Sequence, residues 1–333
     1  MKKLLNKPND YVDQTLEGLC LAHPEYYALG GENRRVIHRP GGVVRGKVGI
    51  VSGGGSGHLP VFTGYCGEGL LDACSIGNVF AGPSVADCVD AMKIANGGSG
   101  VLRLYGNYGG DRMNFDMAGE MLEMEGIEST TVLVADDVAS APSEEAEKRR
   151  GVAGMIYAFK MAGAKAAAGA SLAEVTAIAQ KAADACRSIG VAMTPCTVPE
   201  AGKPTFEIAE DEIEMGMGIH GEPGIWRGKL KPADAIAAEM LDRLLADQTL
   251  EKGDRISVLV NSLGATPHEE LFILYRYLAK RFDELGASVV MPLVGRYATS
   301  MEMTGVSLTI CKLDSELEEL LQAPANCAFW RVG

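Results

Sequence analysis

The chain has 333 residues and a formal net charge of −13 at pH 7. Its length exceeds the size at which one hydrophobic core usually stops growing, which favours two domains. The negative charge repels phosphate groups and anionic lipids, so binding to nucleic acids or membrane surfaces is disfavoured. No apolar core of a signal peptide follows the first residues, and no later segment offers about 18 uninterrupted apolar residues. We therefore expect a cytoplasmic protein.

The composition is that of a globular protein with 47% hydrophobic residues, and the 41 glycines among many small aliphatic residues favour an α/β fold. Eight cysteines are scattered along the chain, and no pair has the spacing of zinc ligands. We expect reduced, mostly buried thiols and no metal bound by this chain.

Three short apolar segments in the first half each predict a strand that ends in a polar or glycine-rich loop. A helical pattern such as that at 114–123 separates them, which is typical of β-α-β units and a largely parallel sheet. Side chains at the carboxyl ends of parallel strands lie in the crevice where such sheets bind ligands. The expected pairs of strand and loop are 47–51 with 52–58, 100–105 with 106–111, and 130–135 with 136–137.

Residues 151–187 have a helical pattern, and Ser171 with Glu174 predicts a capping box for a helix that ends at Gly190. Prolines at 195, 199 and 204 then indicate a connection between two units. We therefore predict two α/β domains, residues 1–186 and 187–333, each with a largely parallel or mixed sheet flanked by helices.

The second half alternates between strand and helix patterns again. Thr266 is expected to be the N-cap of a helix that ends near Gly286, because proline follows it and glutamate stands three residues later. The other expected elements are strands at 206–217, 256–261, 288–293 and 306–313 and a helix at 231–245.

The glycine-rich segment 52–58 invites comparison with phosphate-binding loops. It lacks the lysine of a P-loop, and Pro60 interrupts the following helix pattern. A purely structural turn rarely needs four glycines in five positions, so we favour a flexible loop that contacts a ligand. The chain also lacks the loops and carboxylate clusters with which kinases hold nucleotide and magnesium. Any nucleotide must therefore be bound elsewhere.

Two histidines stand out because each lies at the tip of a glycine loop: His58 and His220. The second satisfies G-x-G-x-x-G formally, but Pro223 follows at once, so no helix is available to hold a pyrophosphate. A mostly neutral imidazole there can act as base or nucleophile. Asp111 supplies a carboxylate at the same crevice, or alternatively caps a helix that begins near Met113.

Asp136 and Asp137 follow the third strand, where they are either metal ligands or helix caps. We favour caps, because no third acidic residue stands at a useful spacing.

Seven segments, in order along the chain, share a pattern with one known family: 52–58, 107–111, 136–139, 149–153, 197–199, 218–224 and 261–267. Among them, G-G-G-S-G-H and G-I-H-G-E-P-G are highly specific as a pair. Together the segments closely resemble the ketose-binding subunit of dihydroxyacetone kinases. The resemblance spans essentially the whole chain.

This resemblance implies a homodimer of two-domain α/β subunits, in which His220 forms a hemiaminal with the carbonyl of a short ketose. It also implies that His58 and Asp111 act as acid and base on the reacting hydroxyl. The residues implied to hold the sugar are Gly55, Ser56, Gly57, His58 and Asp111.

The resemblance also implies a partner, because in this family the phosphoryl donor belongs to a separate nucleotide-binding subunit or domain. That partner holds ATP, or ADP recharged through a phosphocarrier of a phosphotransferase system, with Mg²⁺. The ketose-binding chain itself then binds no cofactor.

Three positions depart from the pattern of the family: Gly106 stands where lysine is common, Gly109 where threonine is common, and Leu59 where glutamate is common. Smaller side chains near the expected substrate suggest a roomier pocket and a four-carbon ketose such as erythrulose. An alternative role is that of a non-catalytic ketose sensor or transcriptional co-activator, which some relatives are. The retention of His58 and Asp111 favours catalysis, because a sensor has less need of an acid and base.

Overall fold

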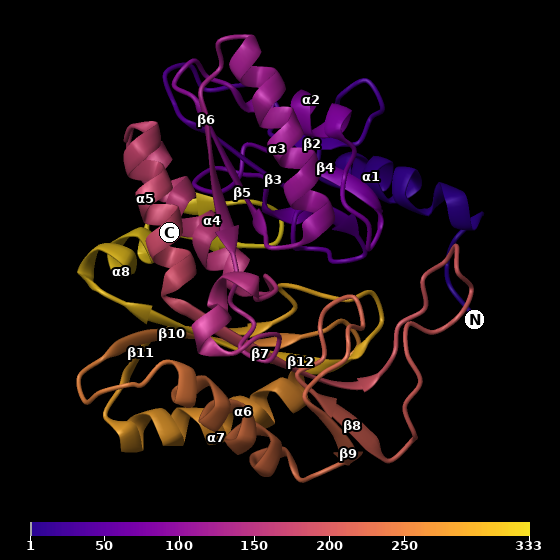
Figure 1. Cartoon of the computed structure of the whole chain (residues 1–333), viewed down its shortest axis with the longest axis vertical. Helices are drawn as coiled ribbons and strands as arrows, with labels where there is room; N and C mark the ends of the chain where they lie inside the picture. The colour runs from indigo at the N-terminus through magenta and orange to yellow at the C-terminus, as the bar shows by residue number, and fades with distance from the viewer. Residues whose placement is uncertain (1) are drawn as a thin grey trace.

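The computed structural model describes residues 2–333 and contains two six-stranded sheets, one above the other in Figure 1. The first sheet comprises β1 (Ala28–Gly30), β2 (Val36–His38), β3 (Gly49–Ser56), β4 (Ala73–Val79), β5 (Val101–Gly106) and β6 (Ser129–Val134). Its order is β1-β2-β4-β3-β5-β6, and the last four strands of this order pair in parallel. The helices of this half are α1 (Tyr11–Ala22), α2 (Val85–Ala95), α3 (Gly109–Met124), α4 (Gly154–Ala167) and α5 (Leu172–Asp184).

The second sheet comprises β7 (Cys186–Thr194), β8 (Glu212–Met215), β9 (Trp226–Lys229), β10 (Arg255–Ser262), β11 (Ser288–Gly295) and β12 (Thr304–Leu313). Its order is β11-β10-β12-β7-β8-β9, and only β10 and β11 pair in parallel. The helices α6 (Ala233–Asp247) and α7 (His268–Leu285) cover its outer face (Figure 1). The remaining elements are α8 (Ser315–Gln322), the ribbon β13 (Ala325–Asn326) with β14 (Arg331–Val332), and the 3-10 turns Pro8–Asp10, Thr63–Tyr65 and Ser143–Lys148.

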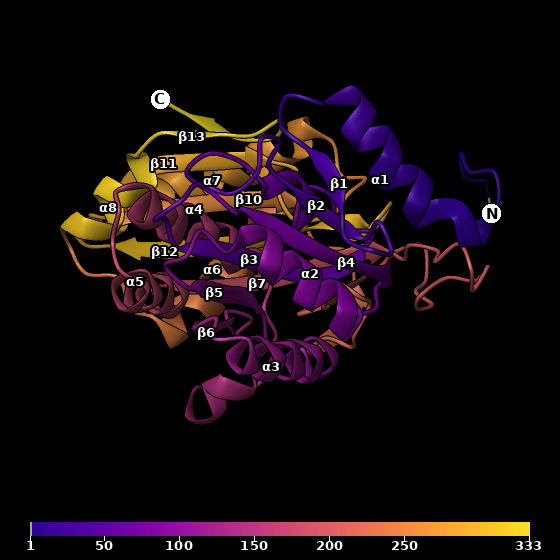
Figure 2. The ribbon, with the colours of Figure 1, turned by 90° about the horizontal axis from the view of Figure 1, so that it is seen from above.

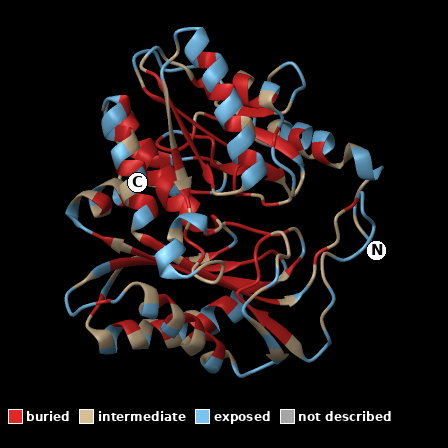
Figure 3. Ribbon diagram, viewed as in Figure 1, coloured by how far each residue is buried: buried red, intermediate tan, exposed pale blue. Residues whose placement is uncertain are grey.

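Helix α4 lies between the two sheets and is buried over almost its whole length (Figure 3). It contacts β3, β5 and β6 on one side and β7 and β12 on the other. Glycine allows α4 to pack closely against the turn before β4, where a Cβ on Gly163 would lie 2.4 Å from the carbonyl oxygen of Gly69. Both sheets therefore cover apolar surface of the same helix.

The predicted fold class is confirmed, since each half is a mixed sheet flanked by helices. The capping box of Ser171 and Glu174 is present at the start of α5. The predicted end of that helix at Gly190 is wrong, because α5 ends at Asp184 and Gly190 pairs within β7. The predicted division at 186/187 separates the strands of the two sheets after the first residue of β7, and as a domain boundary it stays a prediction.

Two expectations for the second half need correction. Thr266 is not the N-cap of α7, because its hydroxyl donates to the carbonyl oxygen of Gly305 and the helix begins at His268. The end at Gly286 is confirmed by a left-handed backbone with a φ of 73°. The strand expected at 206–217 is much shorter, since β8 covers only Glu212–Met215.

The glycine-rich segment after 51 is not a flexible loop. β3 continues through Ser56, and its glycines are required by close packing. A Cβ on Gly53 would lie 2.4 Å from Oγ of Ser75, and one on Gly54 would lie 2.3 Å from the ring of Phe62. These two glycines therefore have a structural explanation that needs no ligand.

Seven of the eight cysteines are buried, Cys20 is partly buried, and all eight are free thiols. Among the described residues, no helix is both long enough and apolar enough to cross a membrane.

We predict that Gly54→Ala destabilises the fold by about 1–3 kcal/mol, because the added methyl group overlaps the buried ring of Phe62. Gly110→Ala is the matched control: no atom lies within 4 Å of a Cβ there, and alanine favours the helix. Urea denaturation of both variants measures the difference. Equal stability of the two variants would contradict the packing account.

Candidate functional site

His58 lies just beyond β3 with its ring buried. Its Nδ1 is 2.6 Å from the carbonyl oxygen of Thr299, which can only accept a hydrogen bond. Nδ1 therefore carries the proton, and Nε2 is left unprotonated and without a partner. Burial, with the nearby His220, lowers the pKa of His58 to about 3. The ring is thus a neutral base at physiological pH.

His220 lies in the loop between β8 and β9, where Glu222 determines which of its ring nitrogens is free. Nδ1 lies 2.9 Å from Oε1 of Glu222, and the backbone N–H of His220 donates to Oε2 at 2.9 Å. Burial opposes the ionisation of Glu222, but the hydrogen bond with His220 outweighs it and lowers the pKa of Glu222 to about 2. A carboxylate accepts the proton on Nδ1, so Nε2 of His220 is the free nitrogen.

Aromatic rings hold the two histidines against each other. The ring centroids of His58 and His220 are 4.9 Å apart at an interplanar angle of 74°. Phe80 stacks on His58 with the ring centroids 4.9 Å apart, and Tyr108 packs edge-on against His220, also with the centroids 4.9 Å apart. The structure therefore brings together the two histidines that stood out in the sequence.

Asp111 lies in the first turn of α3, which begins at Gly109, earlier than expected. The alternative that Asp111 caps a helix starting near Met113 is therefore wrong. The side chain is buried, and its Oδ1 has no hydrogen-bond partner. Burial raises the pKa of Asp111 to about 6, while the nearby His220 opposes this shift. A Cβ on Gly82 would lie 2.7 Å from Oδ1, so only glycine leaves room for this carboxylate.

A short segment of the second half, Thr299 to Met301, bonds to both histidine loops, and we call it the 299–301 clamp. Thr299 accepts from the ring of His58, and the N–H of Met301 donates to the carbonyl oxygen of Gly57 at 2.8 Å. The hydroxyl of Ser300 donates to the carbonyl oxygen of Ile219, next to His220. No sequence motif pointed to this segment, whereas Glu222 lies inside the G-I-H-G-E-P-G motif and was available to inspection.

Gly55, Ser56 and Gly57 form the end of β3 and the residue after it. A Cβ on Gly55 would lie 2.7 Å from the backbone nitrogen of Ala81, and Gly57 has a left-handed φ of 103°. A cavity of about 440 Å³ borders these residues and His58 on the side of α1. Neither His220 nor Asp111 lines this cavity.

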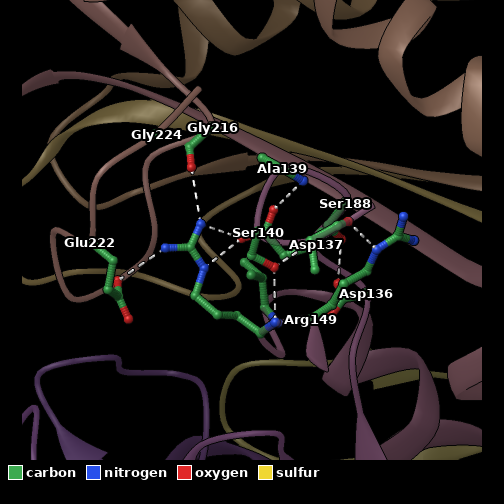
Figure 4. Close-up of polar contacts among 12 residues, drawn as sticks. Asp136, Asp137, Ala139, Ser140, Arg149, Ser188, Gly216, Glu222 and Gly224 are labelled. Atoms are coloured by element: carbon green, nitrogen blue, oxygen red, sulfur yellow. Dashed lines mark hydrogen bonds and ion pairs between the residues drawn. The ribbon is translucent and has the colours of Figure 1, made fainter. Parts of the chain in front are cut away.

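Arg150 ties the His220 loop to the end of β6. Its guanidinium pairs with Asp137 at 2.8 Å, donates to the carbonyl oxygen of Gly216 at 3.1 Å and lies 3.9 Å from Glu222 (Figure 4). Asp136 accepts from the N–H groups of Val152 and Gly154, both at 2.7 Å.

The preference for caps over metal ligands stays a prediction: Asp136 accepts from backbone N–H groups at the start of α4, but the N-cap residue of that helix is Ala153. Asp137 pairs with Arg150 instead. Within residues 2–333, no three His, Cys, Asp or Glu side chains are placed to hold a metal ion together.

Residues 17–329 match the model of the Dak1 domain. The chain belongs to the Dak1 domain family. It is 42% identical over 332 residues to dihydroxyacetone-binding subunit DhaK of the PTS-dependent dihydroxyacetone kinase 2 of Listeria innocua, with both chains covered completely. It is also 42% identical to the L-erythrulose kinase of Pectobacterium atrosepticum, of which it covers 57%. The resemblance found in the sequence is thus confirmed at the level of the family.

Two solved structures have the same fold. The dihydroxyacetone kinase of C. freundii superposes with a TM-score of 0.91 and 32% identity over 99% of this chain and 60% of that chain. The co-activator Dha-DhaQ of a dihydroxyacetone kinase operon superposes with a TM-score of 0.88 and 32% identity, over 98% of this chain and 99% of that chain. One Dak1 fold thus occurs both in a kinase and in a co-activator.

The raised pKa of Asp111 predicts a stability effect that depends on pH. A raised carboxyl pKa favours the folded state at low pH, and this contribution is lost as the pH rises through about 6. Asp111→Asn should therefore be more stable than the wild type by about 1–2 kcal/mol at pH 8, where the wild type buries a charge, and not at pH 4. Urea denaturation at both pH values measures this, and a gain of equal size at both would contradict it.

Proposed function

We propose that this chain is the ketose-binding subunit of a phosphotransferase of the dihydroxyacetone kinase type, and that His220 holds the ketose covalently. The observation that carries the proposal is the free Nε2 of His220 in contact with the ring of His58, whose own Nε2 has no partner. A nucleophile beside a neutral base is the arrangement that addition to a carbonyl and activation of a hydroxyl both require.

In the first step, Nε2 of His220 forms a bond to the carbonyl carbon, and the π electrons of the C=O bond move to the oxygen, which takes a proton from water and releases hydroxide to the solvent. The imidazole ring is then substituted at Nε2, retains its proton on Nδ1 and carries a positive charge. The Glu222 carboxylate, 2.9 Å from Nδ1, stabilises that charge. The bond selects for a carbonyl group, so glycerol is rejected although its hydroxyls are similar.

In the second step, a terminal hydroxyl of the bound ketose attacks the phosphorus of the donor nucleotide, and the bond from phosphorus to the leaving nucleotide breaks. We assign His58 and Asp111 as the groups that receive and hold the proton of that hydroxyl. Nε2 of His58 and Oδ1 of Asp111 have no hydrogen-bond partner, so each can accept this hydrogen bond without breaking an existing one. Gly55, Ser56 and Gly57 contribute backbone contacts to the sugar.

In this proposal, a partner nucleotide-binding subunit binds the nucleotide with Mg²⁺. The nucleotide is either ATP that exchanges or ADP that a phosphocarrier of a phosphotransferase system recharges to ATP. The full-length match to a subunit named PTS-dependent supports the second route. We also propose that the chain forms a homodimer.

The covalent step predicts a ketose adduct on the intact protein. Wild-type chain incubated with dihydroxyacetone or erythrulose should gain the mass of one ketose, and His220→Ala should gain none. Glu222→Gln should retain the fold and form the adduct at least 10-fold less completely, because the ring charge loses its counter-ion. An adduct of equal yield on His220→Ala would sink the assignment.

The substrate is proposed to be a four-carbon ketose. The two positions at which glycine replaces a larger residue, Gly106 and Gly109, support this unequally. A Cβ on Gly106 would lie 3.2 Å from the ring of Tyr108, so that space is already filled. No atom lies within 4 Å of a Cβ on Gly109, two residues before Asp111. The open space is therefore at Gly109. The L-erythrulose kinase among the relatives supports the same preference.

With its cognate partner, the chain should show a higher kcat/KM for erythrulose than for dihydroxyacetone. Gly109→Thr should shift that ratio toward dihydroxyacetone by about 10-fold, because the side chain occupies the open space. Gly110→Ala is the control in the same turn. Equal or better phosphorylation of dihydroxyacetone by the wild type would refute the preference.

A second candidate function is that of a ketose-responsive co-activator, which the match to Dha-DhaQ over nearly the full length of both chains supports. The two roles differ in their need for His58. If the chain is part of a kinase, the wild type should turn over the ketose and His58→Ala should abolish that turnover. If it is a sensor, the wild type itself should show no turnover, and His58→Ala should still form the adduct at His220.

A further inference from the structure

Helix α3 carries four exposed methionines on one face: Met113, Met117, Met121 and Met124, which we call the methionine stripe. Their exposed fractions are 61%, 49%, 42% and 81%. The spacings of four, four and three residues place them on one side of the helix. The opposite side, with Phe115, Ala118 and Leu122, is buried against the first sheet. The stripe therefore contributes nothing to the core.

An exposed face of this kind is available for another macromolecule. Figure 2 shows α3 at the periphery of the molecule, and its outward face is exposed along its length in Figure 3. At a rise of about 1.5 Å per residue, the stripe is about 16 Å long. Methionine side chains are flexible and apolar, which suits them to surfaces that adapt to a partner.

The stripe starts where the phosphoryl donor must arrive. Met113 is two residues from Asp111, in the same first turn of α3. Under the proposed function, on which this inference rests, the donor is carried by another subunit and must reach the hydroxyl held near Asp111. Asp111 and Met113 lie on different sides of the helix, so a subunit that reaches Asp111 by covering the first turn of α3 also borders Met113, the first residue of the stripe.

The charges on α3 argue against a second copy of this chain as the occupant. The stripe is flanked by the exposed acidic residues Asp116, Glu120 and Glu123. Asp116 lies 3.6 Å from Arg103, but no ion pair neutralises Glu120 or Glu123 within the described part of the chain. Two copies that met through this face would bring the same acidic flanks together. A partner with an apolar groove bordered by Lys or Arg matches both features.

We propose that the methionine stripe of α3 is the docking surface for the nucleotide-binding subunit, which contacts it through an apolar groove with a basic rim. The acidic flanks then direct the encounter, and the methionines supply the buried apolar area. Because α3 also positions Asp111, docking and the reacting group share one rigid element.

The test measures binding separately from chemistry. The ADP- and Mg²⁺-loaded nucleotide-binding subunit is titrated into the full chain by calorimetry, in wild type and in the double variant Met117→Lys/Met121→Lys. We expect the Kd to rise at least 10-fold in the variant, while the ketose adduct at His220 and the melting temperature stay unchanged. The matched control is Phe272→Lys on α7, a side chain that is 55% exposed and lies outside the stripe.

A second measurement needs no substitution. With methionine methyl groups labelled with ¹³C, the signals of the four stripe residues should shift on addition of the partner, while those of buried methionines such as Met155 stay in place. An unchanged Kd in the double variant, or stripe signals that do not move, would overturn the docking surface. So would a loss of self-association in the variant at unchanged partner affinity, since the occupant would then be a second copy. A missing adduct in the wild type would instead count against the proposed function alone.

Discussion

The site depends on one constraint: two histidines from different sheets must be held in contact, and the 299–301 clamp does this. A single stretch of backbone accepts the proton of His58 and fixes Gly57, while the hydroxyl of Ser300 holds the residue before His220. These bonds determine which nitrogen of His58 is free. They also fix the distance between the two rings, because neither loop can move without breaking a bond to the same segment. Thr299 and Ser300 are buried, so water does not compete for the bonds that these two residues make.

Two buried groups, one on His58 and one on Asp111, are costly to the folded state. Nε2 of His58 and Oδ1 of Asp111 are buried without partners, and an unmade hydrogen bond in the interior costs about 1–3 kcal/mol. Such groups are tolerated when a ligand supplies the missing partners, which is the role the proposed function gives to the ketose hydroxyl. The rings of Phe80 and Tyr108 pack against the two histidines, and Arg150 pairs with Asp137 beside the His220 loop.

Much of the fold could be predicted from the sequence, because buried strands and capped helices leave local patterns, as at Ser171 and Gly286. The glycines of β3 misled the prediction, since the same residues suit a flexible loop and a strand against which Phe62 and Ser75 pack closely. His58, His220 and Asp111 were found from their glycine-rich surroundings, and their roles were implied by the family. Thr299 was missed because its bond to His58 uses a backbone oxygen, which places almost no demand on side-chain identity, and Ser300 was missed because its single hydroxyl belongs to no motif. Only the three-dimensional contact reveals the clamp.

Helix α4 gives the molecule a mechanical property that neither sheet would have alone. Because its apolar surface is shared by both sheets, separating them would expose the helix on both sides at once, so hinge bending between the halves is strongly resisted. The two halves are therefore not expected to close around a substrate by a hinge motion. The two sheets and α4 form one rigid scaffold, and the 299–301 clamp fixes the histidine loops to it.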